Sequence, residues 1–269
     1  MKKLLMVVTL AILTVSLLVA AGAKESKGDD SLEKVLAKGV FVMGLDDSFP
    51  PMGFRDENNE IVGFDIDLAK EVTKRLGVTL KVQPIDWNAK EQELNTGNID
   101  CIWNGFTITP QRQAVINFSE PYVDNAQVAV VRKNSRYQTL ADLAGQSIGL
   151  QAGSSAADAV NNNKKFAASV KEVIEVKDNL TALMDLEIGG VQAVVLDLFV
   201  AVDNITRSGK DFRILDEHLA SEEYGVGFRK NDQALRDEVQ RVLLAMAQDG
   251  TLAKISTTWF GEDITVVGK

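Results

Sequence analysis

The sequence is poor in the side chains that most often hold metals or form disulfides: it has one cysteine, Cys101, and one histidine, His218, among 269 residues. A single thiol excludes a disulfide within the chain, and one cysteine with one histidine cannot supply the paired ligands of a structural zinc site. Because Ile99, Ile102 and Trp103 surround Cys101, we expect this thiol to lie in a buried strand as a small hydrophobic side chain. We predict no metal site and no cofactor.

Basic residues are also in the minority. Lysine and arginine number 29 against 38 aspartates and glutamates, which gives a formal net charge of −9. Nucleic acids and anionic membrane surfaces both require a basic footprint on the protein that binds them. The charge therefore argues against nucleic acid as a partner. The chain also lacks internal repeats, low-complexity tracts and proline-rich or serine-rich linkers, so we do not expect two separate domains joined by a flexible segment.

Hydrophobic runs long enough for a membrane are confined to the N-terminus, where Lys2 and Lys3 precede an apolar stretch over 4–20 and the small residues "AGA". This pattern is typical of a cleavable signal peptide over 1–23, with cleavage after Ala23. A retained membrane anchor is the alternative, because the stretch is near the lower length limit for spanning a bilayer. No cysteine near the cleavage point offers a site for lipid attachment. We expect a periplasmic or otherwise extracytoplasmic protein.

The rest of the chain alternates short apolar runs with amphipathic helical patterns. The first series has strand-like runs at 40–45, 78–85 and 99–105 separated by helical patterns at 63–77 and 89–97. This order predicts parallel strands with crossover helices. A second series of the same kind follows up to residue 197.

Two apolar runs, "QVAVVRK" (127–133) and "EYGVGFRK" (223–230), bracket the second series. We interpret them as two crossings between lobes, with the helices over 232–260 returning to the first lobe. The sequence therefore predicts an α/β fold of two interleaved lobes, each a mostly parallel sheet flanked by helices. The expected boundaries are 31–128 with 222–269 for lobe 1, and 129–221 for lobe 2.

Polar residues follow several of the predicted strands. In open α/β sheets, ligands bind outside the carboxyl ends of the strands, so these residues are candidates for one cleft between the lobes. They are Asp46, Asn104, Gly105, Gly153, Ser154, Ser155 and Asp197.

Arg112 lies in a place where a cation does not stabilise a helix. Thr109 is a good N-cap and Pro110 suits the first helical position, so Arg112 falls in the first turn, where the helix dipole disfavours positive charge. Arg112 can hold a carboxylate with two hydrogen bonds, helped by the Thr107 hydroxyl and by backbone N–H groups at the helix that begins near Ser155. Asp197 can accept from an ammonium group, so the set suits a zwitterion. A solvated surface charge remains the alternative for Arg112, and a helix N-cap for Asp197.

Five motifs resemble one protein family over essentially the whole chain after the N-terminus. They are "GFDIDLAKEV", "TITPQRQAVINFSEPY", "LADLAGQSIGLQAGSS", "VQAVVLD" and "DGTLAKISTTWFG". In this order they are similar to the bacterial extracellular solute-binding proteins, family 3, which serve polar amino acid ABC transporters. The resemblance implies a two-lobed periplasmic binding protein fold of type II, with two hinge strands and an amino acid held between the lobes.

The resemblance also implies roles for individual residues. Arg112, with Thr107, would bind the ligand carboxylate, Asp197 the ammonium group, and Phe49 and Trp87 would sandwich the ligand side chain. Ser154 and Ser155 match the pair after the glycine of the "QxGSS" motif, and Asp46 matches an acid that meets a side-chain amide or cation. Asn104 and Gly105 depart from the small hydroxyl residues of many relatives, and Glu91 adds a second acid near the side-chain pocket. This set favours arginine, lysine or glutamine as the ligand.

The expected function is therefore binding of a polar amino acid by a monomer that closes over it and docks on an ABC transporter permease, without enzymatic activity. An enzyme resembling cyclohexadienyl dehydratases is one alternative. It needs a general acid in the cleft, for which Asp46, Glu91 and His218 are the candidates. The sensor module of a receptor is the other alternative.

Overall fold

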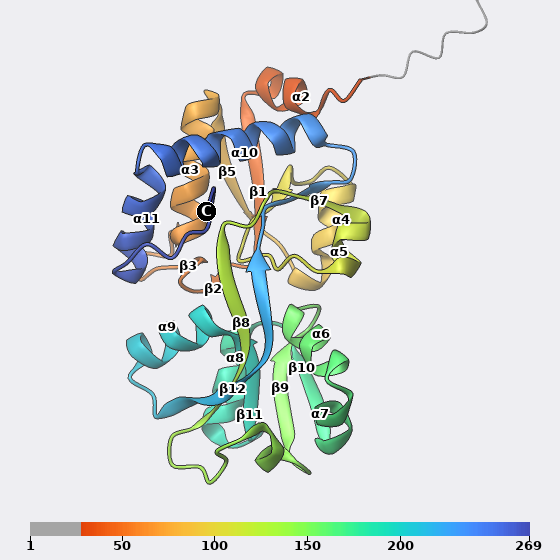
Figure 1. The fold of residues 1–269 in the computed structure, drawn as a ribbon, viewed down its shortest axis with the longest axis vertical. Helices are drawn as coiled ribbons and strands as arrows, with labels where there is room; N and C mark the ends of the chain where they lie inside the picture. Colours follow the sequence, from red (N-terminus) through yellow and green to blue (C-terminus); the bar gives the residue numbers. More distant parts are fainter. Residues whose placement is uncertain (1–27) are drawn as a thin grey trace, which may run out of the picture.

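The computed structural model describes residues 28–269, which form two lobes, each built around a five-stranded sheet (Figure 1). The predicted α/β class and two-lobed architecture are confirmed. The predicted signal peptide, 1–23, lies outside the described residues. Within 28–269, no helix combines the length and the apolar character needed to cross a bilayer.

The sheet of lobe 1 has the strand order β5-β1-β6-β13-β7. Its strands are β1 (Val40–Leu45), β5 (Thr79–Pro84), β6 (Cys101–Ile102), β7 (Ile116–Phe118) and β13 (Gly227–Arg229). β1 pairs in parallel with β5 and β6, and β13 runs antiparallel to β6 and β7. Four of the five strands therefore share one direction, as predicted for a mostly parallel sheet.

Helices cover both faces of this sheet (Figure 1). They are α2 (Ser31–Lys38), α3 (Phe64–Leu76), α4 (Lys90–Asn95), α5 (Pro110–Val115), α10 (Gln233–Gln248) and α11 (Thr251–Phe260), with a 3-10 turn η1 at Trp87–Ala89. The pattern predicted for α3 is confirmed: Ile66, Ala69 and Val72 are buried, and Gly77 ends the helix in the left-handed conformation. Glycine suits this end because it adopts a positive φ without steric cost.

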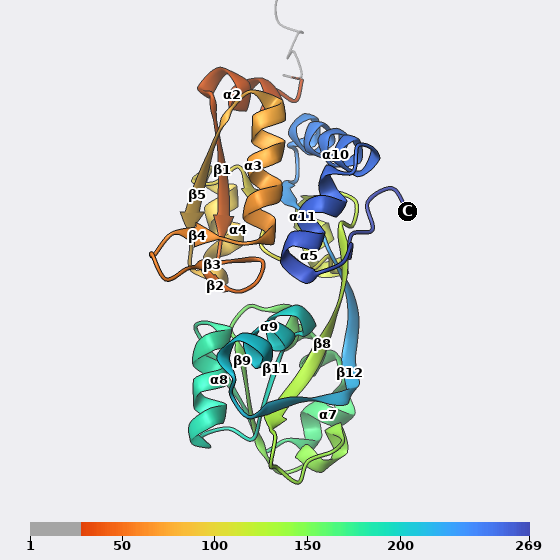
Figure 2. The same cartoon turned by 90° about the vertical axis from the view of Figure 1, so that its left-hand side faces the viewer.

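A small antiparallel sheet of order β2-β3-β4 lies at the edge of lobe 1 that faces lobe 2 (Figure 2). Its strands are β2 (Ser48–Phe49), β3 (Gly53–Arg55) and β4 (Ile61–Val62). From the sequence we predict no element between the strand at 40–45 and the helix at 63–77, because two prolines follow Phe49 and no alternating apolar pattern is long enough to indicate a strand.

The sheet of lobe 2 has the order β10-β9-β11-β8-β12. Its strands are β8 (Val123–Arg132), β9 (Ser147–Gln151), β10 (Glu172–Val176), β11 (Ala193–Asp197) and β12 (Phe212–Tyr224). Strands β9, β10 and β11 are parallel, and β8 runs antiparallel to both β11 and β12. The helical elements of this lobe are η2 (Leu140–Leu143), α6 (Ser155–Asn162), α7 (Lys164–Ser169), α8 (Asn179–Ile188) and α9 (Leu198–Ser208).

Strands β8 and β12 run side by side from one lobe to the other (Figures 1 and 2). They meet between the lobes where Asn125 pairs with Glu222 and Val123 with Tyr224. The apolar run at 127–133 lies inside the sheet of lobe 2, just beyond the crossing, which corrects its interpretation as the crossing itself. The run at 223–230 begins at the crossing, at the end of β12, and continues through a turn into β13 of lobe 1. The run at 127–133 is apolar because it is buried within a sheet, whereas the crossing also carries the polar pair Asn125 and Glu222. The lobe boundaries at 128/129 and 221/222 fall within β8 and β12, and they stay a prediction.

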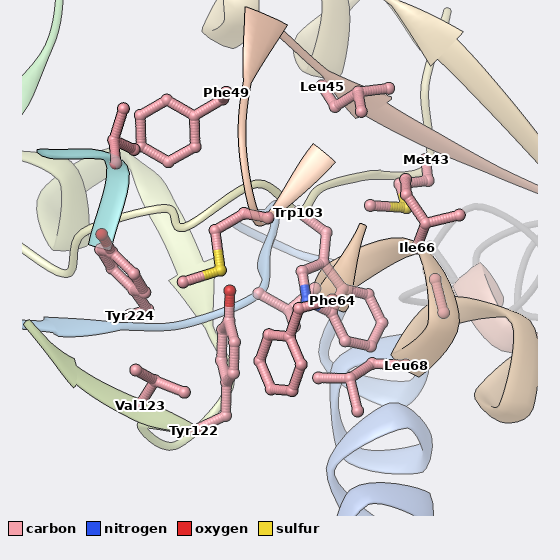
Figure 3. Packing of buried hydrophobic residues seen from close by; sticks show 14 of the residues in the cluster. Met43, Leu45, Phe49, Phe64, Ile66, Leu68, Trp103, Tyr122, Val123 and Tyr224 are labelled. Carbon is pink, nitrogen blue, oxygen red and sulfur yellow. The ribbon is translucent and has the colours of Figure 1, made fainter. Parts of the chain in front are cut away.

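Large aromatic side chains fill the core of lobe 1 behind the cleft (Figure 3). The rings of Phe64 and Tyr122 are 6.4 Å apart between centroids, and those of Trp103 and Tyr122 are 6.2 Å apart. Each is fully buried, and burial of one such side chain contributes about 1.5–3 kcal/mol. Cys101 is buried in the adjacent strand β6, as the sequence predicted. This core fixes the end of β6, from which Asn104 and Gly105 lead into the cleft.

Candidate functional site

Arg112 is held against the cleft by the start of α5. Thr109 caps this helix, since its hydroxyl accepts a hydrogen bond from the Arg112 N–H at 3.1 Å. The guanidinium is buried, lies 4.7 Å from the ring centroid of Phe106, and donates to the carbonyls of Thr107 (2.9 Å) and Gly153 (3.3 Å). Burial lowers the pKa of Arg112, and nearby acids oppose that shift. The buried guanidinium thus has two backbone carbonyls and a ring face as its partners. Its predicted contact with a ligand carboxylate stays a prediction.

Asp197 ends β11 and precedes α9. It stands at the N-cap position, but its side chain does not cap the helix. Instead its Oδ1 accepts from Asn125 Nδ2 and from the Tyr224 hydroxyl, each at 2.7 Å. Burial, followed by the charge of Glu222, raises the pKa of Asp197 to about 7. A cation beside it would favour the ionised form.

Thr107 and Ser155 come from different lobes and meet, with 3.0 Å between their hydroxyl oxygens. Ser155 is the first residue of α6, and Ser154 precedes it without capping the helix through its side chain, which donates to the Gln151 carbonyl instead. Because the Ser154 side chain does not cap α6, the first backbone N–H groups of this helix have no side-chain acceptor from Ser154. Backbone N–H groups at a helix start can bind an anion.

The backbone conformation and the close packing at position 105 both require glycine. Its φ is +53°, and an added Cβ would lie 2.9 Å from Phe49 Cε1 and 3.1 Å from Tyr224 Cζ. Phe49 and Trp87 are both nearly buried on the lobe 1 side of the cleft. Figure 3 shows Phe49 and Tyr224 on the same side of the core of lobe 1, on different elements. A side chain at position 105 would displace one of these rings.

One small cavity between the lobes is lined by eight of the eleven predicted site residues. These are Phe49, Trp87, Gly105, Thr107, Arg112, Ser154, Ser155 and Asp197, and Gln151 completes the lining. Its volume is about 10 Å³, which is room for about one water molecule. The lobes are therefore closed on each other in this structure.

The other three predicted residues do not line this cavity. Asp46 lies behind Gln151, whose amide donates to Asp46 Oδ2 at 2.7 Å, and burial raises the pKa of Asp46 to about 6. Asn104 accepts from the Asp46 N–H at 3.0 Å and so ties two loops of lobe 1 together. Glu91 is half-buried in the first turn of α4, because that helix turns Lys90 inward instead. Ligand contacts by these three, as by the eight that line the cavity, stay a prediction.

Sequence reasoning missed several polar residues that support the site. Lys90 donates to the Gly153 carbonyl at 2.9 Å, and burial with the charge of Arg112 lowers the pKa of Lys90 to about 8. Glu222 on β12 accepts hydrogen bonds from Thr107 and Ser155. The available signal for Glu222 was its place two residues before Tyr224, because alternate residues of a strand share one face.

Comparison with protein families identifies the chain. Residues 41–262 match the bacterial extracellular solute-binding proteins, family 3. The chain belongs to this family. Among curated family relatives, the L-cystine-binding protein TcyJ of Escherichia coli is 28% identical, over 95% of this chain and 96% of that protein. The arginine-binding extracellular protein ArtP of Bacillus subtilis is 30% identical, over 97% of this chain and 98% of ArtP. Proteins of the family are extracellular or periplasmic.

Solved structures of the family confirm the type II periplasmic binding protein fold. Tv2483 bound to L-arginine matches with a TM-score of 0.86 and 33% identity, over 90% of this chain and 99% of that one. A substrate-binding protein of an ABC uptake transporter from Streptococcus pneumoniae, with bound histidine, also has a TM-score of 0.86, at 35% identity over 90% of this chain and all of that one. An ancestral amino-acid-binding protein, AncCDT-1, a precursor of cyclohexadienyl dehydratase, matches at 0.79 and 30% identity, over 86% of this chain and 99% of that one.

Proposed function

We propose that the protein binds a polar amino acid in the cavity between its lobes and delivers it to the permease of an ABC transporter. The observation that carries this proposal is the placement of Arg112 and Asp197, both buried, in one cavity. Buried opposite charges require partners, and an amino acid supplies a carboxylate for Arg112 and an ammonium group for Asp197. The relatives named above, which bind arginine, histidine or cystine, support the same ligand class.

The surrounding charges favour arginine, lysine or glutamine among the amino acids. Once Arg112 and Asp197 are paired with the ligand, buried Asp46, behind Gln151, and half-buried Glu91 remain as acids near the cavity. A cationic side chain balances such acids, and a side-chain amide can donate to one of them. Phe49 and Trp87 offer flat apolar surfaces to the stem of the side chain.

The closed state is stabilised by contacts between the lobes that the open state cannot make. Lys90 and Arg112 of lobe 1 both reach the Gly153 carbonyl of lobe 2, and Asp46 of lobe 1 reaches Gln151. A ligand shifts the protein toward this state to the extent that it binds the closed form better than the open one. Because the closed cavity is small, we expect the lobes to part before an amino acid enters.

The decisive experiment is thermal unfolding of the protein without residues 1–23 against a panel of the twenty amino acids, ornithine, citrulline and cystine, followed by titration calorimetry of each hit. A ligand at a thousandfold excess over its dissociation constant stabilises the folded state by about 4 kcal/mol. A shift with arginine, lysine or glutamine supports the proposal. No shift with any compound contradicts it, and copurification with a receptor instead of a permease contradicts the transport role.

We expect no turnover of prephenate or arogenate, the test of the dehydratase alternative. His218 is exposed on β12 and does not line the cavity. Asp197 is the acid that lines this cavity and is therefore the candidate general acid for a dehydratase. Product formation that Asp197→Asn abolishes would overturn the binding-protein proposal.

A further inference from the structure

Glu222 collects hydrogen bonds from every part of the molecule that meets at the cleft. Its Oε2 accepts from Gln127 Nε2 at 2.9 Å, Thr107 Oγ1 at 3.1 Å, Asn125 Nδ2 at 3.3 Å and Ser155 Oγ at 3.3 Å. Thr107 belongs to lobe 1, Ser155 to lobe 2, and the two amides to the hinge strand β8. Four donors around one oxygen require an acceptor, as an ionised carboxylate is.

The hydroxyls of Thr107 and Ser155 have one proton each, and the acceptors around them determine where these protons go. Each hydroxyl has one proton to donate and lone pairs to accept with. The acceptors within reach of the two hydroxyls are each other, at 3.0 Å, and Glu222. Thr107 can donate to Ser155 and Ser155 to Glu222, or the reverse order holds, or both donate to Glu222. In each arrangement both protons are used inside the network.

Both hydroxyls also line the cavity that contains Arg112 and Asp197. With both protons used inside the network, the hydroxyls can offer lone pairs but no proton to the cavity, and Thr107 keeps a free lone pair in every arrangement. A carboxylate needs donors and gains nothing from such groups, whereas an ammonium group donates and is stabilised by them. This differs from the sequence-based prediction, which placed Thr107 beside the ligand carboxylate.

The charged surroundings of Glu222 agree with this arrangement. Asp197 lies on the far side of Asn125, whose Nδ2 donates to both carboxylates, and Arg112 is the nearby cation. Burial raises the pKa of Glu222, while its hydrogen bonds with Gln127 and Thr107 and the charge of Arg112 favour ionisation. The amide of Gln127 also donates to the Ser155 hydroxyl at 3.1 Å, which leaves the proton of that hydroxyl for Glu222 or Thr107.

We propose that Glu222 is a positioning residue that turns the hydroxyls of Thr107 and Ser155 into acceptors toward the cavity and thereby selects ligands with an ammonium group. The proposal rests on the proposed function of amino acid binding. This end of the cavity should therefore reject 2-hydroxy acids and other analogues in which a neutral group replaces the ammonium group.

The test is a cycle of four titrations by calorimetry, with wild type and Glu222→Gln, each against an amino acid and its 2-hydroxy analogue. The probe is L-arginine with 5-guanidino-2-hydroxypentanoic acid. If the panel selects another amino acid, that one and its own 2-hydroxy analogue replace the pair. The glutamine amide donates to a hydroxyl and frees a hydroxyl proton for the cavity. We expect the substitution to weaken binding of the amino acid at least about tenfold, and binding of the analogue less than about threefold.

Two further variants distinguish the positioning role of Glu222 from a general effect of removing a negative charge or of disturbing the fold. Glu223→Gln removes an exposed acid from the next position of the same strand and should leave both affinities unchanged. Glu222→Asp keeps the acceptor and should recover discrimination between the two ligands. Equal losses for both ligands in Glu222→Gln would overturn the proposal, because a structural role weakens both alike.

If Glu222→Gln does not fold, as judged by circular dichroism, Thr107→Val tests the same point, since it removes the acceptor and leaves Glu222 in place. It should weaken the amino acid more than the 2-hydroxy analogue. The amino acid amide, in which the carboxylate is replaced, is the comparison. If Thr107→Val weakens binding of the amino acid but not of its amide, Thr107 donates to the carboxylate, and the proposal is overturned. Wild type that binds no amino acid would contradict the proposed function itself, an outcome distinct from both.

Discussion

Arg112 is buried although the glutamines on both sides of it, Gln111 and Gln113, face solvent. Its partners are backbone carbonyls, of Thr107 and Gly153, and the face of the Phe106 ring. None of these neutralises its charge. At the scale of single residues, Arg112 is therefore held by neutral groups in direct contact, and the nearby acids act on its charge from a distance.

Arg112→Ala should reduce ligand affinity by about 3 kcal/mol, roughly a hundredfold or more, because the ligand carboxylate would lose its charged partner inside the closed cleft. Titration calorimetry with the best ligand of the panel measures the loss. Arg136→Ala removes an exposed arginine of lobe 2 and serves as the control. Near-unchanged affinity in Arg112→Ala would contradict the assignment of the carboxylate to this residue.

Asp65 makes the free energy of unfolding depend on pH, and because it lies within lobe 1, this dependence does not require closure of the lobes. It is fully buried in lobe 1, where its Oδ2 accepts from the Gly105 N–H at 2.7 Å and from the Tyr122 hydroxyl at 3.0 Å. Burial raises the pKa of Asp65 from 3.8 to about 7. The folded state thus keeps a proton that the unfolded state releases between these values, so the stabilisation is complete below pH 4 and is lost as pH rises toward 7.

Asp65→Asn should remove this dependence, since an amide does not titrate. Relative to the variant, ligand-free wild type should lose up to about 4 kcal/mol of unfolding free energy between pH 4 and pH 8, because each pKa unit corresponds to about 1.4 kcal/mol. Urea unfolding of both proteins at the two pH values measures the difference. Parallel pH profiles would show that Asp65 is ionised throughout in the folded protein.

Sequence reasoning predicted residues whose neighbours carry a local signal. Arg112 was identified from the cap that precedes it, and Asp197 from the strand that it ends, and both line the cavity. Strand alternation places Glu222 on the same face as Tyr224 and Glu223 on the other face, but the sequence does not show which of the two faces meets the cavity. That face is set by the pairing of β12 with β8, which is a long-range contact.

At the scale of secondary structure, helices with clear capping residues were predicted well. Strands whose extent is set by pairing with another strand were not. α3 has an apolar face and a glycine cap, and α5 has Thr109 and Pro110 at its start. β12, by contrast, is long but exposes polar residues on both faces over much of its length. Without an apolar alternation, its extent depends on its partner strand and is not visible in its own sequence.

Helix α9 joins the lobes outside the cavity. Phe199 lies 5.2 Å from Phe260 of α11 between ring centroids, and the Arg207 guanidinium lies 4.5 Å from the ring centroid of Phe54 in β3. Phe199 and Arg207 belong to lobe 2, and their partners to lobe 1. These contacts stabilise the closed state without touching the lining of the cavity.

Phe199→Ala should therefore weaken ligand binding by about 0.5–1.5 kcal/mol, the usual contribution of an aromatic pair. The loss should appear mainly as faster ligand release in stopped-flow fluorescence, because the contact forms in the closed state. Val202→Ala, on the exposed side of the same helix, is the matched control. An affinity equal to that of wild type would show that α9 does not contribute to closure.

At the scale of the whole molecule, two strands are the only chain connections seen between the lobes within residues 28–269 (Figure 2). Such a connection permits a hinge motion in which each lobe moves as a rigid body. The closed arrangement brings Thr107 and Ser155 together from opposite sides.

Small-angle X-ray scattering should show a larger radius of gyration for ligand-free protein than for protein saturated with its amino acid. The expected decrease reflects closure driven by contacts from both lobes. Arg112→Ala at the same ligand concentration should keep the larger radius. Identical scattering of wild type with and without ligand would contradict a closing mechanism.

The order of strands along the chain has a consequence for folding. The sheet of lobe 1 places β13, from near the end of the chain, between β6 and β7, whereas all five strands of lobe 2 lie in one continuous stretch. During synthesis lobe 2 can complete its sheet before residue 227 exists, but lobe 1 cannot. The half of the protein that emerges first is thus the half that finishes last, and its apolar strand edges stay open until then. Such edges are where unfolded chains associate with each other, so lobe 1 is the part that most needs protection from aggregation.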